Sequence, residues 1–327
     1  MVRNPQWISL SGASHLCSGL SHSLHGFYRL APRTLSALPD AVAEQSRFPA
    51  GVKIRFASDT SRLHLQALGS THSKGCGIDL LVDGIYWKTV HLRRGELVDQ
   101  CLFRDLPRQS RQFELYLPHQ QEVDSLQIGV DEAGTVSPLQ HAEAKPLLLY
   151  GSSIAQGAGA QCSYLSYASI IGRELNRELF NFGFYGAGRA EPEVVACFAE
   201  CSAAAVILDL GKSYGTQPVG AYRQMLSQIR EAQPQVPILC VTPIFSSREF
   251  YDPRFAQLSD GIRSVVAEAA SEMGDRVSVV DGLALLGRDD WRGLCNDGLH
   301  PNEMGFSRIA ERLLPTLQQA MIQQASG

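Results

Sequence analysis

The spacing of apolar residues changes near residue 131, and this change restricts the folds available to the chain. Before that point, several short segments alternate apolar and polar residues, as half-buried strands do. Three of them span 52–56, 63–67 and 113–117. Asp83-Gly84 joins two apolar segments and predicts a hairpin with a type I′ turn, which requires positive φ at both positions. We therefore predict an antiparallel, jelly-roll-like β-sandwich over residues 1–135.

After residue 146, buried apolar runs alternate with amphipathic segments. The runs predict strands over 147–150, 206–210, 237–241 and 277–280. The segments between them predict helices over 164–179, 219–232, 254–273 and 302–321. This alternation is typical of a parallel sheet covered by helices on both faces.

The segment 131–146 separates the two patterns. It is polar and contains Gly and Pro, so we interpret it as a linker. The chain has 327 residues, which exceeds one typical domain. We predict a β-sandwich domain over 1–135 and an α/β domain over 146–327.

The charge and hydropathy of the chain exclude several classes of partner. The formal net charge is −4 and no long basic run occurs, so no nucleic acid or anionic membrane is expected as a partner. No apolar stretch approaches the roughly 18 residues of a membrane-spanning helix. The first residues lack the apolar core of a secretory signal, so a cytoplasmic location is expected. A homo-oligomer stays an open alternative.

The eight cysteines give no metal signature. No CxxC pair occurs, and no Cys/His cluster has zinc spacing. Cys197 and Cys201 lie four residues apart, and we interpret them as buried small side chains, with a metal or disulfide pair as the alternative. Cys240, within an apolar run, is expected in the core. We predict no metal and no organic cofactor.

Ser152 and Ser153 follow Gly151 where the strand predicted over 147–150 ends. Ligands of open α/β sheets bind at the carboxyl ends of the strands. A serine at a strand-to-helix turn is exposed and close to helix-terminal N–H groups, which suits a nucleophile. The alternative is a pair of ordinary helix-capping serines.

Asp297 and His300 lie three residues apart just before the last predicted helix. At this spacing the carboxylate can orient the imidazole, and the imidazole can take a proton from a serine. The alternative is a loop in which Asp is a turn former. Of nine histidines, only His300 lies beyond residue 141, so serine chemistry in this half has a single candidate base.

The segment 181–188 contains three glycines, which let backbone N–H groups approach a ligand. It lacks the GxGxxG pattern and follows a predicted helix instead of a strand. A dinucleotide site is therefore not predicted here.

Together, these segments resemble the SGNH (GDSL-type) hydrolase family over the whole C-terminal half. The first family block matches 151–153, Gly186 matches the glycine of the second block, and 297–300 matches the DxxH block. The resemblance implies a flavodoxin-like three-layer αβα fold.

The resemblance also implies the roles of individual residues. Ser153 would be the nucleophile, and His300 and Asp297 would complete its triad. The oxyanion hole would use the backbone N–H groups of Ser153 and Gly186.

The third family block departs from its usual GxND pattern. Gly211-Lys212-Ser213-Tyr214 stands there, with Ser213 in place of the asparagine that donates to the oxyanion. A serine hydroxyl can donate too, so Ser213 is the candidate third donor. Lys212 is expected to be a solvated surface side chain, with a reach into the site as the alternative.

The N-terminal half resembles the GxDL(Y)-type β-sandwich domain that precedes some SGNH domains. Gly77-Ile78-Asp79-Leu80 carries the signature, with Leu81 where a tyrosine is usual. Asp79 itself is interpreted as a structural residue. Two-domain carbohydrate esterases and a polyketide-tailoring acyltransferase share this arrangement.

These features together predict a serine esterase that hydrolyses short-chain acyl esters, acetyl esters above all. The expected substrate is a small-molecule or oligosaccharide ester, such as an ester of a carbohydrate or small glycoside. The first alternative is an acyltransferase with the same triad, which would move an acyl group, for example from acyl-CoA, to an alcohol. The second is a non-catalytic binding protein in which the altered third block marks lost activity.

Overall fold

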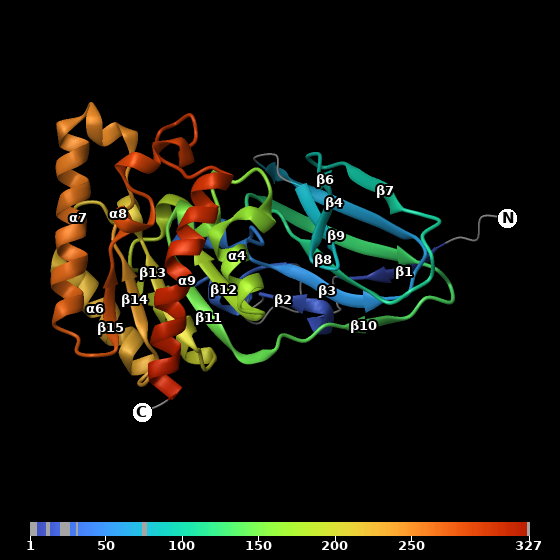
Figure 1. The fold of residues 1–327 in the computed structure, drawn as a ribbon, viewed down its shortest axis with the longest axis horizontal. Helices are drawn as coiled ribbons and strands as arrows, with labels where there is room; N and C mark the ends of the chain where they lie inside the picture. Colours follow the sequence, from blue (N-terminus) through green and yellow to red (C-terminus); the bar gives the residue numbers. More distant parts are fainter. Residues whose placement is uncertain (1–4, 11–13, 20–26, 31, 74–76, 326–327) are drawn as a thin grey trace. The chain divides into compact units, whose positions relative to one another are not determined.

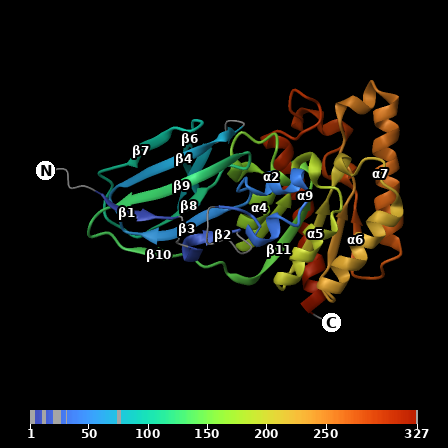
Figure 2. The same ribbon diagram turned by 180° about the vertical axis from the view of Figure 1, so that it is seen from behind.

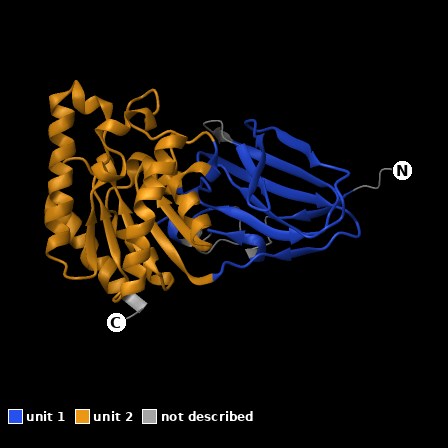
Figure 3. Cartoon of the chain, in the orientation of Figure 1, with its two compact units in different colours: residues 1–36, 46–142, 162–164 blue, residues 37–45, 143–161, 165–327 orange. Residues whose placement is uncertain are grey.

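The computed structural model describes residues 5–10, 14–19, 27–30, 32–73 and 77–325. The chain forms two compact units (Figure 3). The N-terminal unit comprises residues 1–36, 46–142 and 162–164, and the C-terminal unit comprises 37–45, 143–161 and 165–327. No helix in the described ranges is long and apolar enough to cross a membrane.

The N-terminal unit consists of two antiparallel sheets around one apolar core. The first sheet has the order β1 (Gln6–Ser9), β9 (Gln121–Val130), β4 (Leu63–Ser73) and β7 (Leu97–Phe103). The second has the order β10 (Val136–Pro138), β3 (Lys53–Ser58), β8 (Arg111–Tyr116), β5 (Gly77–Val82) and β6 (Ile85–His91), with β2 (Cys17–Ser18) also paired to β3. Leu65 and Ile128 of the first sheet share this core with Ile54 and Phe113 of the second. The jelly-roll description of this sandwich stays a prediction.

The hairpin predicted at Asp83-Gly84 is confirmed. Asp83 has φ 51° and Gly84 has φ 77°, and they join the antiparallel strands β5 and β6. The segment interpreted as a linker, by contrast, contains strand β10. Its residue Val136 packs against the N-terminal core, and its Pro138 is tolerated because β10 is an edge strand.

The C-terminal unit is built on a five-stranded parallel sheet. Its order is β12 (Arg177–Gly183), β11 (Glu143–Gly151), β13 (Ala205–Asp209), β14 (Ile238–Val241) and β15 (Val277–Val280). Numbered within the unit, this is the flavodoxin-like order 2-1-3-4-5.

Helices cover both faces of the sheet. Residues of α4 (Tyr167–Glu174) and α9 (Glu303–Ala325) share an apolar core with β11 and β13, and α9 lies in front of the sheet in Figure 1. From the opposite side, α5 (Pro192–Ala196) and α6 (Val219–Ala232) lie in front (Figure 2). The other α-helices are α1 (Pro32–Leu35), α2 (Asp40–Ser46), α3 (Ser153–Gln156), α7 (Pro253–Ser271) and α8 (Gly282–Leu285).

The helix predicted over 164–179 is wrong in its second half. Helix α4 ends at Glu174, and the chain turns at Asn176, whose φ of 42° is tolerated by asparagine. The residues that follow form strand β12, which pairs with β11 in parallel. The segment 181–188 is therefore entered from a strand.

Short 3₁₀ helices follow the carboxyl ends of three strands of the C-terminal sheet. They are η3 (Tyr185–Ala187) after β12, η5 (Gly211–Tyr214) after β13 and η6 (Ser247–Phe250) after β14. The remaining ones are η1 (Ser14–Leu16), η2 (Ser163–Leu165), η4 (Cys197–Glu200) and η7 (Arg288–Gly293). Parallel strands thus bring η3, η5 and η6 to one edge of the sheet.

Candidate active site

Ser153, His300 and Asp297 form a hydrogen-bonded array at the carboxyl edge of the C-terminal sheet. His300 Nε2 lies 2.9 Å from Ser153 Oγ, and His300 Nδ1 lies 2.6 Å from Asp297 Oδ2. Ser153 is the first residue of α3, and one residue, Ser152, separates it from the end of β11. With Nδ1 protonated and bonded to Asp297, Nε2 is free to accept the serine proton.

Ser152 occupies the N-cap position of α3 but makes no side-chain capping bond. The side chain of Ser152 is buried, whereas Ser153 Oγ faces His300. Of the two adjacent serines, the geometry therefore favours Ser153 as the one able to react.

The Asp297 carboxylate is held from two sides. Its Oδ1 accepts hydrogen bonds from the backbone N–H groups of Leu299 at 2.9 Å and His300 at 3.0 Å. Partial burial raises its pKa, but the hydrogen bonds from the His300 ring and the two N–H groups outweigh burial and hold the pKa below its usual value. The carboxylate therefore stays charged and can orient the imidazole.

A tight turn positions the Asp297–His300 segment. Gly298 has φ 66°, and a Cβ there would overlap Ser247 Oγ, so this position requires glycine. The Gly298 carbonyl accepts from Ser246 Oγ at 2.6 Å and from the N–H of Ser247 at 2.9 Å. The loop after β14 thereby fixes the loop that carries two of the three array residues.

Gly186 lies in η3 and contributes to the lining of the pocket described below. A Cβ at Gly186 would meet nothing within 4 Å. The close backbone approaches in this segment occur instead at Gly183 and Gly188, where a Cβ would overlap the Gln156 backbone nitrogen and the Gly151 carbonyl. Sequence reasoning did not separate these two roles.

Tyr185 was not identified from the sequence. Its ring stacks on the His300 imidazole, with centroids 6.1 Å apart and an interplanar angle of 26°. Its φ of 50° is unusual for a tyrosine. Ser213 Oγ donates to the Tyr185 carbonyl at 3.3 Å, so η5 is tied to η3.

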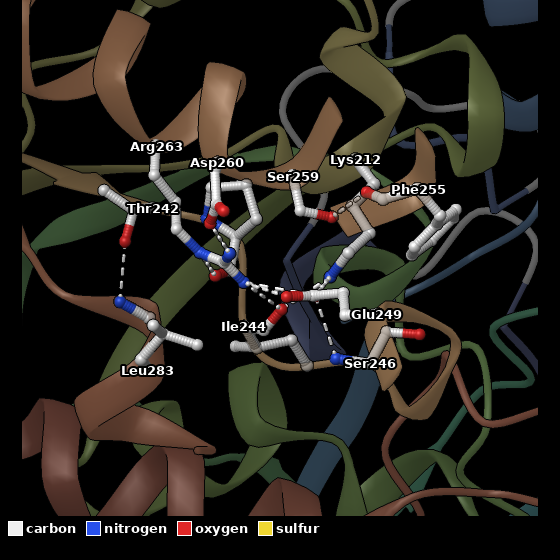
Figure 4. A network of polar contacts seen from close by, with 12 residues as sticks. Lys212, Thr242, Ile244, Ser246, Glu249, Phe255, Ser259, Asp260, Arg263 and Leu283 are labelled. Carbon is white, nitrogen blue, oxygen red and sulfur yellow. Dashed lines mark hydrogen bonds and ion pairs between the residues drawn. The ribbon is translucent and has the colours of Figure 1, made fainter. Parts of the chain in front are cut away.

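The expectation that Lys212 is solvated is wrong. Its ammonium lies 3.2 Å from Glu249 Oε1 and donates to the Ile244 carbonyl at 2.5 Å. Figure 4 shows that the Glu249 carboxylate lies between Lys212 and Arg263, whose Nη2 donates at 3.0 and 3.1 Å. Burial lowers the pKa of Lys212 to about 8. The cluster joins η5, η6 and α7, which are far apart in sequence and gave no local signal.

Asp209, at the end of β13, is also buried beside the array. Its backbone carbonyl accepts from the Ser152 N–H at 3.0 Å, and its carboxylate accepts from the Tyr167 hydroxyl at 2.9 Å. Burial raises its pKa to about 6, against the Tyr167 hydrogen bond and the Lys212 charge, which lower it.

Replacing Asp209 by Asn should change how stability depends on pH. Because its folded-state pKa is raised, Asp209 contributes stability below about pH 4 that is lost as pH rises through the window from about 4 to about 6. Asparagine does not titrate, so the Asp209→Asn variant lacks this loss. We therefore expect the difference in unfolding free energy, variant minus wild type, to increase by about 3 kcal/mol from the lower to the upper end of this window. Urea unfolding between about pH 4 and pH 7 measures it. The exposed Asp260→Asn is the control, and a difference for Asp209→Asn that is independent of pH would contradict the assignment.

A pocket of about 620 Å³ opens onto the array, and all its lining residues belong to the C-terminal unit. Ser153, His300, Gly186 and Ser213 contribute to its lining. Its apolar wall consists of Ile154, Pro243, Ile244, Phe255, Leu258 and Leu299. This combination suits a small organic ligand with one reactive polar group.

Cysteines and metal-ligating side chains form no further site in the described ranges. The seven described cysteines form no disulfide, Cys197 and Cys201 included, and Cys240 is in the core as expected. Among the residues that the structure describes, no group of three or more His, Cys, Asp or Glu side chains is arranged to hold a metal ion.

The strand order and the Ser-His-Asp array at the carboxyl edge define the class of the C-terminal unit, an SGNH-type α/β hydrolase. The model of the GDSL-like Lipase/Acylhydrolase family matches residues 144–318, and the chain belongs to this family. The model of the N-terminus of SGNH-hydrolase-type esterases matches residues 6–136. The predicted ester hydrolase with a GxDL(Y)-type N-terminal domain is thereby confirmed.

Solved structures share this fold over nearly the whole chain. A GDSL-like protein from Bacteroides ovatus is 20% identical, with a TM-score of 0.85 and 98% of each chain covered. A salicylyl-acyltransferase from a tetracycline biosynthetic pathway is 19% identical, with a TM-score of 0.84 over 96% of this chain and 97% of that one. An acetyl xylan esterase from Butyrivibrio proteoclasticus is 14% identical, with a TM-score of 0.66 over 96% and 98%. A search of curated protein sequences found no match.

Proposed function

We propose that the protein is a serine esterase that hydrolyses short-chain acyl esters, in particular acetyl esters of a carbohydrate or small glycoside. The observation that carries the proposal is the hydrogen-bond chain from Ser153 through His300 to Asp297 at the base of a mostly apolar pocket. Membership of the acylhydrolase family supports the same chemistry.

In the proposed mechanism, His300 Nε2 takes the proton of Ser153 as Oγ attacks the ester carbonyl. The tetrahedral intermediate collapses when His300 gives this proton to the departing alcohol oxygen. Water then enters, loses a proton to His300 and attacks the acyl-serine, and the proton returns to Ser153 Oγ as the acid leaves. Asp297 holds the ring and stabilises its charge in both halves.

The oxyanion hole in this proposal uses the N–H groups of Ser153 and Gly186, with Ser213 in support. The Ser213 hydroxyl donates to the Tyr185 carbonyl, which belongs to the same peptide group as the Gly186 N–H. A trans peptide is planar, with N–H and C=O pointing in opposite directions. Holding that carbonyl therefore aims the Gly186 N–H, and we assign Ser213 this positioning role in place of the asparagine usual in the family.

Ser213→Ala should lower kcat by about fivefold, with a much smaller change in KM, because one hydrogen bond worth about 1 kcal/mol no longer holds the peptide. Ser213→Thr keeps the hydroxyl and should restore most of kcat. Steady-state kinetics on an aryl acetate measures both. An alanine variant with wild-type kcat would remove Ser213 from the mechanism.

Carbohydrate esters are supported by the fold and by the pocket. An acetyl xylan esterase and a family two carbohydrate esterase from Cellvibrio japonicus share the architecture over 96% and 97% of this chain. A pocket of about 620 Å³ is within the range of small-molecule sites. A panel of acetylated sugars and aryl esters of increasing chain length tests this: fastest turnover of acetyl esters is expected, and a preference for long acyl chains would contradict it.

Acyl transfer is the second candidate, and one comparison favours it. The salicylyl-acyltransferase matches this chain with a TM-score of 0.84 over nearly its full length. An acyl-serine at Ser153 would then be attacked by an acceptor alcohol instead of water. Incubation with an acyl-CoA and candidate acceptors distinguishes the two reactions, because a transferase forms ester product in excess of free acid.

A further inference from the structure

Two basic side chains besides His300 line the pocket, Lys212 and Arg189. Of the two, Lys212 has an acidic partner within ion-pair distance. Lys212 is paired with Glu249 at 3.2 Å. Arg189 is exposed, and no carboxylate of the described residues lies within ion-pair distance of its guanidinium. Its positive charge is therefore not offset within the pocket.

The nearby Glu191 carboxylate does not supply the missing partner. It accepts the backbone N–H of Arg189 at 2.8 and 3.0 Å and also the Tyr150 hydroxyl. The one acidic residue of the pocket lining, Asp209, is bonded to Tyr167. Neither carboxylate forms an ion pair with Arg189.

Three backbone contacts fix the position of Arg189. Its Nε donates to the Gly186 carbonyl at 2.9 Å, its N–H is bonded to Glu191, and its carbonyl accepts from Gln217 Nε2 at 2.7 Å. The two terminal nitrogens of the guanidinium make no hydrogen bond to the described residues. A planar guanidinium with two unused N–H-bearing nitrogens fits a carboxylate or phosphate in a bidentate manner.

We propose that Arg189 binds an anionic group, a carboxylate or a phosphate, on the substrate. The proposal rests on the esterase function proposed above and narrows its substrate class to negatively charged esters. Because Arg189 is bonded to Gly186, the anion lies on the side of the oxyanion hole, a few atoms from the ester carbonyl. It belongs to either the acyl group or the alcohol.

Two matched ester pairs distinguish the acyl and alcohol sides. para-Nitrophenyl hemisuccinate and para-nitrophenyl butyrate differ by a carboxylate against a methyl group in the acyl chain. The acetate esters of para-hydroxybenzoate and para-cresol differ in the same way on the alcohol. The rate with Ser153→Ala protein gives the background for each ester.

The readout is the ratio of kcat/KM for the anionic ester to kcat/KM for its neutral partner. We expect Arg189→Gln to lower this ratio about 10- to 100-fold in at least one pair, the loss expected for a hydrogen bond to a charged group. Arg189→Lys keeps the positive charge but loses the planar guanidinium. Its ratio should therefore lie between the ratio of the wild-type protein and that of Arg189→Gln. Arg254→Gln removes the same charge from an exposed position on α7 outside the pocket lining and should leave the ratio unchanged.

Three outcomes would overturn the inference or its premise, and they are distinguishable. If Arg189→Gln leaves both ratios unchanged, Arg189 does not bind the anion. If Arg254→Gln lowers the ratios as much as Arg189→Gln, the effect is a long-range field and not a site. If the wild-type protein hydrolyses none of the four esters above background, the esterase function itself fails.

Discussion

Replacing Ser153 by alanine should lower kcat for short-chain esters by about 10⁴-fold or more, because no acyl-serine can form. His300 and Asp297 would keep their mutual hydrogen bond, so the fold and substrate binding should persist. Release of para-nitrophenol from its acetate measures the rate. A fluorophosphonate should label the wild-type protein stoichiometrically at Ser153, as peptide mass spectrometry would show, and should not label the variant.

Ser152→Ala is the matched control, because it removes the same hydroxyl from the adjacent residue. Ser152 Oγ makes no capping bond, and the variant should keep labelling at Ser153. Wild-type turnover by Ser153→Ala would refute the assignment of the nucleophile. Failure of the wild-type protein to label would favour a non-catalytic binding protein.

Replacing Glu249 by glutamine should lower the unfolding free energy by about 3 kcal/mol. The Glu249 carboxylate is 11% exposed and neutralises two side chains that are themselves 11% and 13% exposed, Lys212 and Arg263. The variant keeps the shape of the side chain but leaves these buried cations without their shared counter-charge. Urea unfolding at pH 7 measures the loss.

Glu268→Gln is the control for this prediction. Glu268 pairs with Arg223 on the surface, where its side chain is 56% exposed, and such pairs contribute less than about 1 kcal/mol. A Glu249→Gln variant as stable as Glu268→Gln would mean that the buried cluster contributes little to stability. The role of the Lys212–Glu249–Arg263 cluster would then be limited to placing η5 beside the pocket.

The Ser-His-Asp array was predictable because each of its residues belongs to a short local motif. The parallel topology of the sheet then brings the motifs together. Asp297 and His300 are three residues apart, and Ser153 lies two residues after the glycine that ends an apolar strand. The carboxyl ends of parallel strands meet at one edge, so these signals converge once the sheet is recognised. The hairpin at Asp83-Gly84 was equally local.

Features that depend on distant or weak signals were missed. Strand β12 was hidden because an amphipathic helix runs into it and a single asparagine, Asn176, makes the turn. Lys212, Glu249 and Arg263 come together only through the packing of η5, η6 and α7, and nothing local marks Lys212 as buried. The left-handed backbone conformation of Tyr185 was also missed, because nothing about a tyrosine predicts a positive φ.

The turn at Gly298 limits which residues can stand at that position. The turn at Gly298 has no room for a Cβ because Ser247 Oγ occupies that space, and the Gly298 carbonyl is the acceptor for Ser247 and Ser246. At φ 66° any side chain at position 298 is strained, and its Cβ would also overlap Ser247 Oγ. Homologues that share this arrangement should therefore retain glycine at position 298 whatever residue stands at position 247, although Gly298 takes no part in the proposed chemistry.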